Sequence, residues 1–350
     1  MMVRSYSYIA TPPGATIKEQ LEDRGMSQKE FAARMDLSEK HVSRLLNGKV
    51  ELTPDVARRL EMVLGIPASF WNKLEAIYRE KLVKIKDENE MEEDKEISKN
   101  FPYSDMAKHG WVSKSTKPEE KVVSLRKFFE VAKLSLIAPM LLDRIACRKL
   151  GNTDKSKYAL MAWIQQAKRE ARRRKTASIN VEGLKTSVPK IRKMTNMDAT
   201  AFSSKLIDLL ADYGISLVYL PHLKDSYLQG ATFYDGKKYV IGLTARNKYA
   251  DIFWFSLFHE LGHIILGHVG KLGGTSEEDE HEADLFAENS LIPQEPLKRF
   301  IQKEDYSKTA ILKFAKDVGV DVGIVTGRLQ KEHVIQYSEY LELKKKYVIA

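Results

Sequence analysis

A pair of histidines inside an apolar segment limits the possible structures of this 350-residue chain more than any other pattern in its sequence. His259-Glu260-Leu261-Gly262-His263 lies within a stretch whose apolar residues predict one helix over residues 251–269. Residues four apart share one helical face, so both imidazoles can bind one metal ion while Glu260 takes a proton from the water on that metal. A catalytic zinc ion has three protein ligands and one open position. The sequence therefore predicts a zinc site whose third ligand comes from another element.

An acidic segment downstream offers that third ligand. Glu280-His281-Glu282-Ala283-Asp284 is expected to lie on a second helix. A glutamate followed four residues later by an aspartate is similar to the thermolysin-like (gluzincin) arrangement. There Glu280 would bind the metal, and Asp284 would accept the outer N–H of a ligand histidine. Glu282 is the rival ligand, and His281 is a weaker one.

His268 is a further histidine close to the pair. The metzincin pattern would require glycine at position 266 and histidine at position 269, where this chain has Leu266 and Val269. We therefore expect His268 to lie at the end of the helix, at the surface or behind a ligand, rather than on the metal.

The N-terminal part of the chain has the pattern of two short helices joined by a tight turn. Ser27-Gln28-Lys29-Glu30 predicts a capping box at the start of a helix over residues 28–35. Ser38 would cap a second helix that ends near Leu46 after a turn containing Asp36. This spacing is typical of a helix-turn-helix, in which the N-terminal end of the second helix contacts bases.

The residues expected to contact double-stranded DNA lie on and around that second helix. Base edges would be read near its start, and phosphates would be held by the flanking side chains. The predicted DNA-binding residues are Gln28, Ser38, Glu39, Lys40, Ser43, Arg44, Asn47 and Lys49. The alternative is a helical bundle with an ordinary charged surface, because residues 12–79 have a net charge of only +1.

The distribution of charge and the spacing of apolar residues divide the rest of the chain into segments. Residues 84–99 are almost all charged, so the segment 81–99 is predicted to be a solvated linker or an exposed helix end at a domain boundary. Residues 100–200 are predicted to be a helical middle region with 22 basic and 9 acidic residues, and helices are expected over residues 124–142 and 158–175. The basic run from Lys168 to Lys175 is either a solvated helix face or an additional contact with nucleic acid or the acidic linker. Strands are expected at 215–220, 231–234 and 239–243, with a hairpin turn at Asp235-Gly236. The expected fold is mainly α with a small β-sheet, an α+β fold.

Composition limits the class of protein. One cysteine, Cys147, excludes an internal disulfide and suits a reducing cytoplasm, and no apolar run reaches the length of a membrane span. We expect a cytoplasmic protein with no signal peptide and no membrane partner.

Two family resemblances cover most of the sequence. Residues 12–80 resemble the XRE, or lambda-repressor-like, helix-turn-helix family and its HigA-type antitoxin branch, through Met26–Ala32, Val42–Lys49 and Thr53–Glu61. Asp36 departs from the glycine that is usual in the turn. The resemblance implies operator binding as a homodimer, which would double the phosphate contacts of a nearly neutral module.

Residues 201–350 resemble the ImmA/IrrE family of zinc metallopeptidases. The matching stretches are Tyr213–Val218, Phe255–His263, Glu280–Ala287, Leu291–Pro293 and Gly323–Gln330. The resemblance implies a regulator whose peptidase domain cuts a regulatory protein such as a repressor, with Glu260 as the general base. The second hypothesis is a HigA-like antitoxin and autorepressor with a cognate toxin, whose C-terminal domain only senses or docks.

Overall fold

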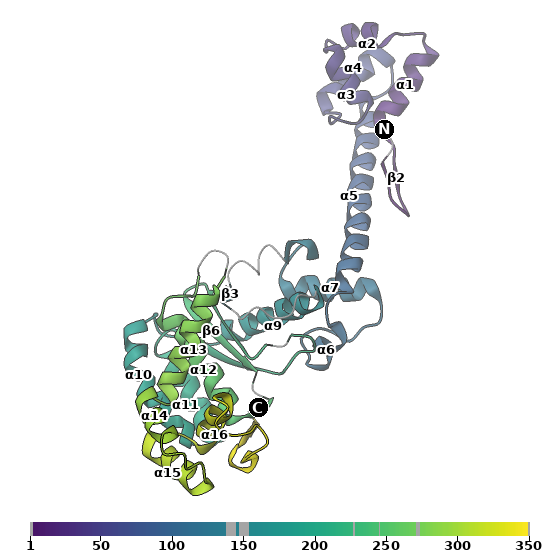
Figure 1. The fold of residues 1–350 in the computed structure, drawn as a ribbon. Helices are drawn as coiled ribbons and strands as arrows, with labels where there is room; N and C mark the ends of the chain where they lie inside the picture. Colours follow the sequence, from purple (N-terminus) through teal and green to yellow (C-terminus); the bar gives the residue numbers. More distant parts are fainter. Residues whose placement is uncertain are drawn as a thin grey trace. The chain divides into compact units, whose positions relative to one another are not determined.

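The structure is a computed structural model of the chain and describes residues 3–137, 145–146, 154–226, 228–244, 246–270 and 274–348. The chain forms two compact units that divide between Glu96 and Ile97, close to the end of helix α5. Helices predominate in both units and the sheets are small (Figure 1), which confirms the expected α+β fold. Among the described residues, no helix combines the length and the apolar character that a membrane crossing requires.

The first unit is a helical bundle preceded by a short antiparallel β-ribbon (Figure 1). Its elements are β1 (Val3–Arg4), β2 (Ile9–Ala10), α1 (Pro13–Asp23), α2 (Gln28–Arg34), α3 (Glu39–Leu46), α4 (Pro54–Leu64) and α5 (Ala68–Ser98). Phe31, Val42, Leu60 and Trp71 are fully buried where these helices meet. Burial of such side chains is the main favourable contribution to folding of a bundle this small.

Two details of this unit differ from the sequence-based expectations. Ser27 accepts a hydrogen bond from the Glu30 backbone N–H, but the Glu30 side chain pairs with Arg34 rather than returning to Ser27, so only half of the capping box forms. Residues 81–98 belong to the continuous helix α5, so this segment is the exposed helix end of the two alternatives and not a separate linker. Its pairs four apart, such as Glu80 with Lys84, support a helix with little apolar surface to bury.

The second unit contains the remaining elements. Its helices are α6 (Tyr103–Lys108), α7 (Pro118–Phe129), α9 (Asp154–Arg172), α10 (Val181–Lys193), α11 (Ala199–Ala211), α12 (Ala250–Ile265), α13 (Glu277–Leu291), α14 (Gln294–Ile301), α15 (Lys308–Val318) and α16 (Val322–Lys331). Its strands are β3 (Ile145–Ala146), β4 (Ile215–Leu220), β5 (Gly230–Asp235), β6 (Lys238–Thr244), β7 (Arg246–Tyr249) and β8 (Lys346–Val348). Short 3-10 turns cover Leu134–Leu136, Met194–Asn196 and Leu341–Leu343.

A mixed sheet in the order β3-β5-β6-β4 lies at the centre of the second unit. β5 and β6 form the antiparallel hairpin expected around Gly236, and β4 runs parallel to β6. Alternate side chains face opposite sides, so Ile241 packs in the cluster that contains α12 while Val240 packs in the cluster that contains α9. Both faces of the sheet are therefore covered, and the strands are buried along most of their length.

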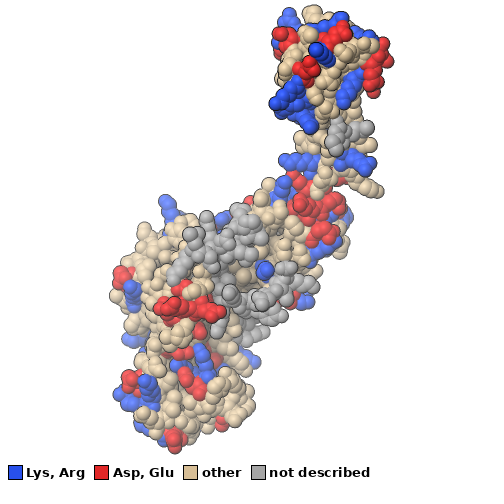
Figure 2. All heavy atoms as spheres, turned by 45° about the horizontal axis from the view of Figure 1, so that its top comes forward, with Lys and Arg blue, Asp and Glu red and all other residues tan. Residues whose placement is uncertain are grey.

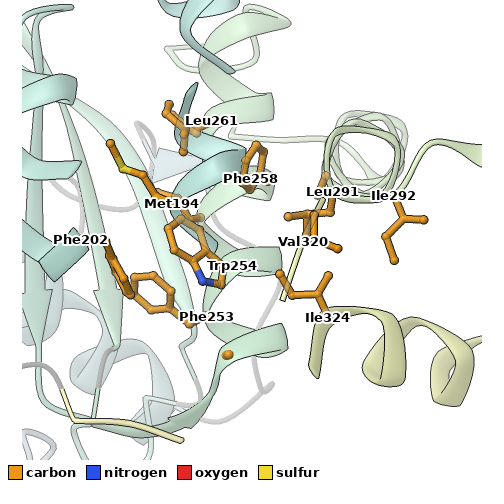
Figure 3. Close-up of a cluster of buried hydrophobic side chains, with 14 of the residues drawn as sticks. Met194, Phe202, Phe253, Trp254, Phe258, Leu261, Leu291, Ile292, Val320 and Ile324 are labelled. Atoms are coloured by element: carbon orange, nitrogen blue, oxygen red, sulfur yellow. The ribbon is translucent and has the colours of Figure 1, made fainter. Parts of the chain in front are cut away.

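Helix α12 is the centre of the larger core. Phe253, Trp254, Phe258 and Leu261 are buried against residues from several other elements, including Phe202 of α11 (Figure 3). Because the apolar side chains fix the rotation of α12 about its axis, they also fix the direction in which its polar residues point.

The middle of the chain differs from the expectation in two ways. The helix expected over residues 124–142 ends at Phe129, where Glu130 takes a left-handed conformation, and part of that range lies outside the described residues. Residues 97–200 belong to one compact unit with the C-terminal region, because α9 packs on β4 and β6.

Candidate functional site

Helices α12 and α13 cross closely at a glycine. A Cβ added at Gly262 would lie 3.2 Å from the Ala283 Cα and 3.2 Å from the Phe286 ring, so only small residues permit this approach. Ser276 caps α13 with a full capping box, which fixes where the helix begins. The crossing brings Glu280, in the first turns of α13, to the two histidines of α12.

Three potential metal ligands converge at this crossing. Nε2 of His259 lies 3.0 Å from Nε2 of His263. The Glu280 carboxylate lies 3.3 Å from the first of these nitrogens and 3.5 Å from the second. Glu280 is thus the acidic residue next to both histidines, whereas its rival Glu282 contacts His268 and His281 is exposed.

These distances fit one tetrahedral cation. Zinc bonds of about 2.0–2.2 Å to nitrogen and oxygen place neighbouring ligand atoms roughly 3.3 Å apart. Oε2 of Glu280 is buried and has no hydrogen bond of acceptable geometry, although His259 lies nearby. A buried carboxylate oxygen without a donor, facing two imidazole nitrogens, is an arrangement that a shared cation completes.

Both ring nitrogens that point away from this centre have partners. Nδ1 of His259 lies 2.8 Å from Oδ1 of Asp284, as the spacing between Glu280 and Asp284 predicts. Nδ1 of His263 lies 3.1 Å from Nδ1 of His268, which is buried behind it. Such outer contacts fix the ring orientation and the tautomer of a metal-binding histidine.

Glu260 lies beside the centre and is held from the sheet. Thr232 on β5 donates its hydroxyl hydrogen bond to Oε2 of Glu260 at 2.5 Å. A Cβ added at Gly230, on the same strand, would lie 2.7 Å from Oε1 of Glu260, so the glycine leaves room for the carboxylate. Burial raises the pKa of Glu260 to about 7, although His259 and Thr232 favour its charged form. A carboxyl group with a pKa near neutrality suits proton transfer in both directions.

The pKa values of the neighbouring groups shift in directions that follow from the contacts of each group. Burial alone would lower the pKa of His259, but its interactions with Asp284 and Glu280 outweigh burial and raise it to about 9. Burial and the charge of His259 lower the pKa of His263. Burial would raise the pKa of Glu280, but interactions with His259 and with the Thr275 hydroxyl lower it.

A cavity of about 400 Å³ opens next to His259 and Glu260. Its apolar walls include Ile252, Phe255 and Ile324. Its remaining lining residues are Leu228, Gln229, Gly230, Asp251, Ser256, Asp284, Glu288, Leu291, Ile292, Gly327, Arg328 and Lys331. A mostly apolar hollow with a few charged groups beside titratable residues is typical of a small-molecule or peptide site.

The first unit contains the expected helix-turn-helix. Ser38 accepts a hydrogen bond from the His41 backbone N–H and caps α3, and Asp36 takes the left-handed conformation that the turn requires. Arg59 of α4 donates to the backbone carbonyls of Met35 and Asp36, which ties the turn to the bundle.

The predicted DNA-binding residues lie on the accessible side of this unit. Gln28, Ser38, Glu39, Lys40, Arg44 and Lys49 are exposed, and Ser43 and Asn47 are partly buried. Asn47 donates to the Ser43 carbonyl and accepts from Lys18. Figure 2 shows positive and negative side chains together on the visible face of this unit, in keeping with its small net charge.

The basic run at the end of α9 is engaged with the protein itself. Arg172 pairs with Glu130 and Asp235, and Arg174 donates to the Leu217 carbonyl. Lys168 and Arg169 lie over the rings of Phe233 and Phe128. Most of the run therefore contacts the second unit itself and is not the purely solvated helix face of the first alternative, and these contacts give no support to nucleic-acid binding.

Several residues at the site were not expected from the sequence. Thr232, Thr275 and Gly230 are separated from the histidines along the chain, and no local pattern marks them. His268 was expected at the end of the helix, at the surface or behind a ligand, and the structure places it behind His263. The Leu266-Gly267-His268 sequence is typical of a helix that ends in a left-handed glycine.

Comparison with known proteins agrees with this organisation. Residues 17–71 match the helix-turn-helix family, and residues 211–330 match the IrrE N-terminal-like domain. Over 63 residues the chain is 40% identical to YddM of Escherichia coli (strain K12), an uncharacterized HTH-type transcriptional regulator; the aligned part is 18% of this chain and 67% of that protein. The first match contains α2 and α3, and the second contains His259, His263 and Glu280. The resemblances to the XRE-type helix-turn-helix family and to the ImmA/IrrE family are confirmed, and the matches do not test the HigA-type branch.

Proposed function

We infer that this chain, which belongs to the HTH-type transcriptional regulators and carries an IrrE N-terminal-like domain, binds operator DNA and cleaves a regulatory protein by zinc-dependent hydrolysis. The observation that supports the hydrolytic step is the convergence of His259, His263 and Glu280 beside the buried Glu260.

Each residue at the site would have a separate role in peptide hydrolysis. A zinc ion held by His259, His263 and Glu280 would supply Lewis-acid polarisation of the scissile carbonyl. Glu260 would accept a proton from the attacking water and return it to the leaving amine, so that water adds across the peptide bond. Thr232 keeps the Glu260 carboxylate oriented, and Asp284 keeps Nε2 of His259 directed inward.

The cavity beside Glu260 gives the substrate a binding surface. Its apolar walls would take an apolar side chain close to the scissile bond, because burying such a side chain contributes roughly 1.5–3 kcal/mol. The partner proposed for this site is therefore a protein segment that carries an apolar residue, presented in an extended form.

The first unit would bind the operator DNA. α3 would enter the major groove with Lys40 and Arg44, and dimerisation would double the contacts of this nearly neutral unit. We expect Arg44→Ala to weaken operator binding by about 1–3 kcal/mol. Arg34→Ala, which removes an exposed pair with Glu30 on α2, is the matched control. The measurement is fluorescence anisotropy with the DNA upstream of the chain's own gene.

The hydrolytic proposal is tested with the full-length, zinc-loaded chain and the proteins encoded beside it. Wild type should cleave one of them, and Glu260→Gln should not, while its zinc content stays the same. Glu295→Gln, an exposed change on α14, should behave as wild type. If neither a neighbouring protein nor the chain itself is cut, and Glu260→Gln leaves the regulatory output unchanged, hydrolysis is excluded and the second unit senses or docks.

A further inference from the structure

A second cluster of potential metal ligands lies behind the first. His268, Asp279 and Glu282 offer ligand atoms within 4.8 Å of one another. Nε2 of His268 lies 3.0 Å from Oε2 of Glu282 and 3.6 Å from Oδ1 of Asp279. Its other ring nitrogen, Nδ1, lies 3.1 Å from Nδ1 of His263. The cluster either binds a second metal or acts on His263.

These two roles require opposite proton positions. If Nε2 of His268 bound a metal, Nδ1 of His268 would carry the proton and donate it to Nδ1 of His263. Nε2 of His263 would then be protonated and would have no lone pair for the first centre.

The opposite arrangement of protons leaves Nε2 of His263 able to bind a metal at the first centre. Nε2–H of His268 donates to the Glu282 carboxylate and faces the Asp279 carboxylate at 3.6 Å, so its Nδ1 carries a lone pair. That lone pair accepts the hydrogen bond of Nδ1–H of His263. Nε2 of His263 is then unprotonated and faces His259 and Glu280.

The backbone fixes His268 in this position. Gly267 takes a φ of +78° at the end of α12. The backbone N–H of His268 donates to the His263 carbonyl at 2.8 Å, and that of Gly267 donates to the Ile264 carbonyl at 3.2 Å. This is the Schellman pattern of hydrogen bonds. The same two residues, His263 and His268, are therefore joined through the backbone and through their rings.

We propose that His268 is a positioning residue that sets the tautomer of His263, and that its cluster holds no metal while the first centre is filled. The Glu282 carboxylate orients His268 by a hydrogen bond, with the negative charge of Asp279 close by, and His268 in turn orients His263. Asp284 acts in the same way, but directly, on His259. This inference rests on the proposed role of His263 as a metal ligand but not on peptide hydrolysis.

The test uses the full-length chain and zinc alone. Zinc affinity is measured by competition with a chromophoric chelator, and bound zinc is counted by elemental analysis. His268→Leu removes the acceptor and should weaken zinc binding by about 10–100-fold. His268→Asn retains an acceptor oxygen at the distance of Nδ1 from the backbone and should recover most of the affinity. Wild type should bind one zinc ion per chain.

A second measurement is made on the wild-type chain. In zinc-loaded wild type labelled with ¹⁵N-histidine, the ring nitrogens of His263 should show a protonated Nδ1 and a metal-bound Nε2, and His268 should be protonated on Nε2. His263→Gln assigns the signals. This measurement remains decisive if His268→Leu fails to fold.

Three results would overturn the proposal. They are two zinc ions per wild-type chain, a protonated Nδ1 on His268, and equal losses of affinity in His268→Leu and His268→Asn. Zinc binding as expected without cleavage of any protein would remove the proposed hydrolysis and leave this inference intact. A wild-type chain that binds no zinc would remove both.

Discussion

A methyl group added at Gly230 tests the geometry around Glu260. The new Cβ of Gly230→Ala would lie 2.7 Å from Oε1 and 3.0 Å from Cγ of Glu260, and 3.0 Å from Cδ2 of Leu243. Ordinary contact begins near 3.4 Å, so the carboxylate must retreat by about 0.7 Å. It cannot retreat freely, because Thr232 holds its other oxygen and both side chains are buried.

The displacement predicts a loss of rate rather than a loss of metal. A misplacement of about 1 Å in a catalytic group can lower the rate on the order of 100-fold, so about 0.7 Å should lower kcat by roughly 10–100-fold. This range corresponds to roughly 1.4–2.7 kcal/mol in the activation free energy. Overpacking should also destabilise the second unit by about 1–3 kcal/mol. Zinc content should stay at the wild-type value, because the three atoms nearest to the new Cβ belong to Glu260 and Leu243 and not to His259, His263 or Glu280.

The assay is turnover of the protein substrate by zinc-loaded chains, with zinc content and thermal unfolding measured on the same samples. Gly236→Ala, in the turn of the same hairpin, is the control: it strains a residue at φ +68° but meets nothing within 4 Å. A kcat of Gly230→Ala close to wild type, or a loss of activity that only follows a loss of zinc, would contradict the predicted displacement of Glu260.

Three further perturbations test other contacts. Gly14→Ala should lower the denaturation midpoint of the first unit despite its better helix propensity, because its Cβ would lie 2.2 Å from the Leu46 carbonyl oxygen; a higher midpoint would contradict the close approach of α1 and α3. Chelation of zinc should destabilise the second unit by about 2.7 kcal/mol if zinc was present at 100 times its Kd, and calorimetry that shows no change would argue against the metal centre. Neutralising Arg173 and Lys175, the exposed basic residues at the end of the run, should leave the salt dependence of DNA binding unchanged, whereas a flatter slope would indicate phosphate contacts.

Local patterns anticipated much of what the fold contains. The capping serines, the tight turn and the buried spacing of Val42 and Leu45 predict the helix-turn-helix, because these signals act within one or two turns of helix. The pairing of His259 with His263 and the hairpin at Gly236 follow from fixed periods of the backbone. Such features depend on neighbours in the sequence, so the order of residues is enough to specify them.

The function of the basic side chains in the middle region could not be predicted from the sequence. The charge of this region, with 22 basic against 9 acidic residues, invites a nucleic-acid interpretation. Whether a basic side chain is free for a partner depends on what the fold places beside it, and Arg172 and Arg174 are bound to groups far away in the chain. The boundary expected near residue 200 also depends on tertiary contacts. Helix α9, which precedes residue 200, packs on strands β4 and β6, which follow it, so the two regions belong to one unit.

The order of residues is enough to place two histidines on one face of a buried helix, a glutamate directly after the first of them, and an acidic helix downstream. Which acidic residue joins the histidines depends on the packing of the helices, because the crossing at Gly262 and Ala283 brings Glu280 to them and turns Glu282 toward His268. Packing also decides how Glu260 is held, since Thr232 comes from a strand. Proton positions and a carboxylate pKa depend on distances of a few ångströms between side chains remote in sequence, and packing alone sets those distances.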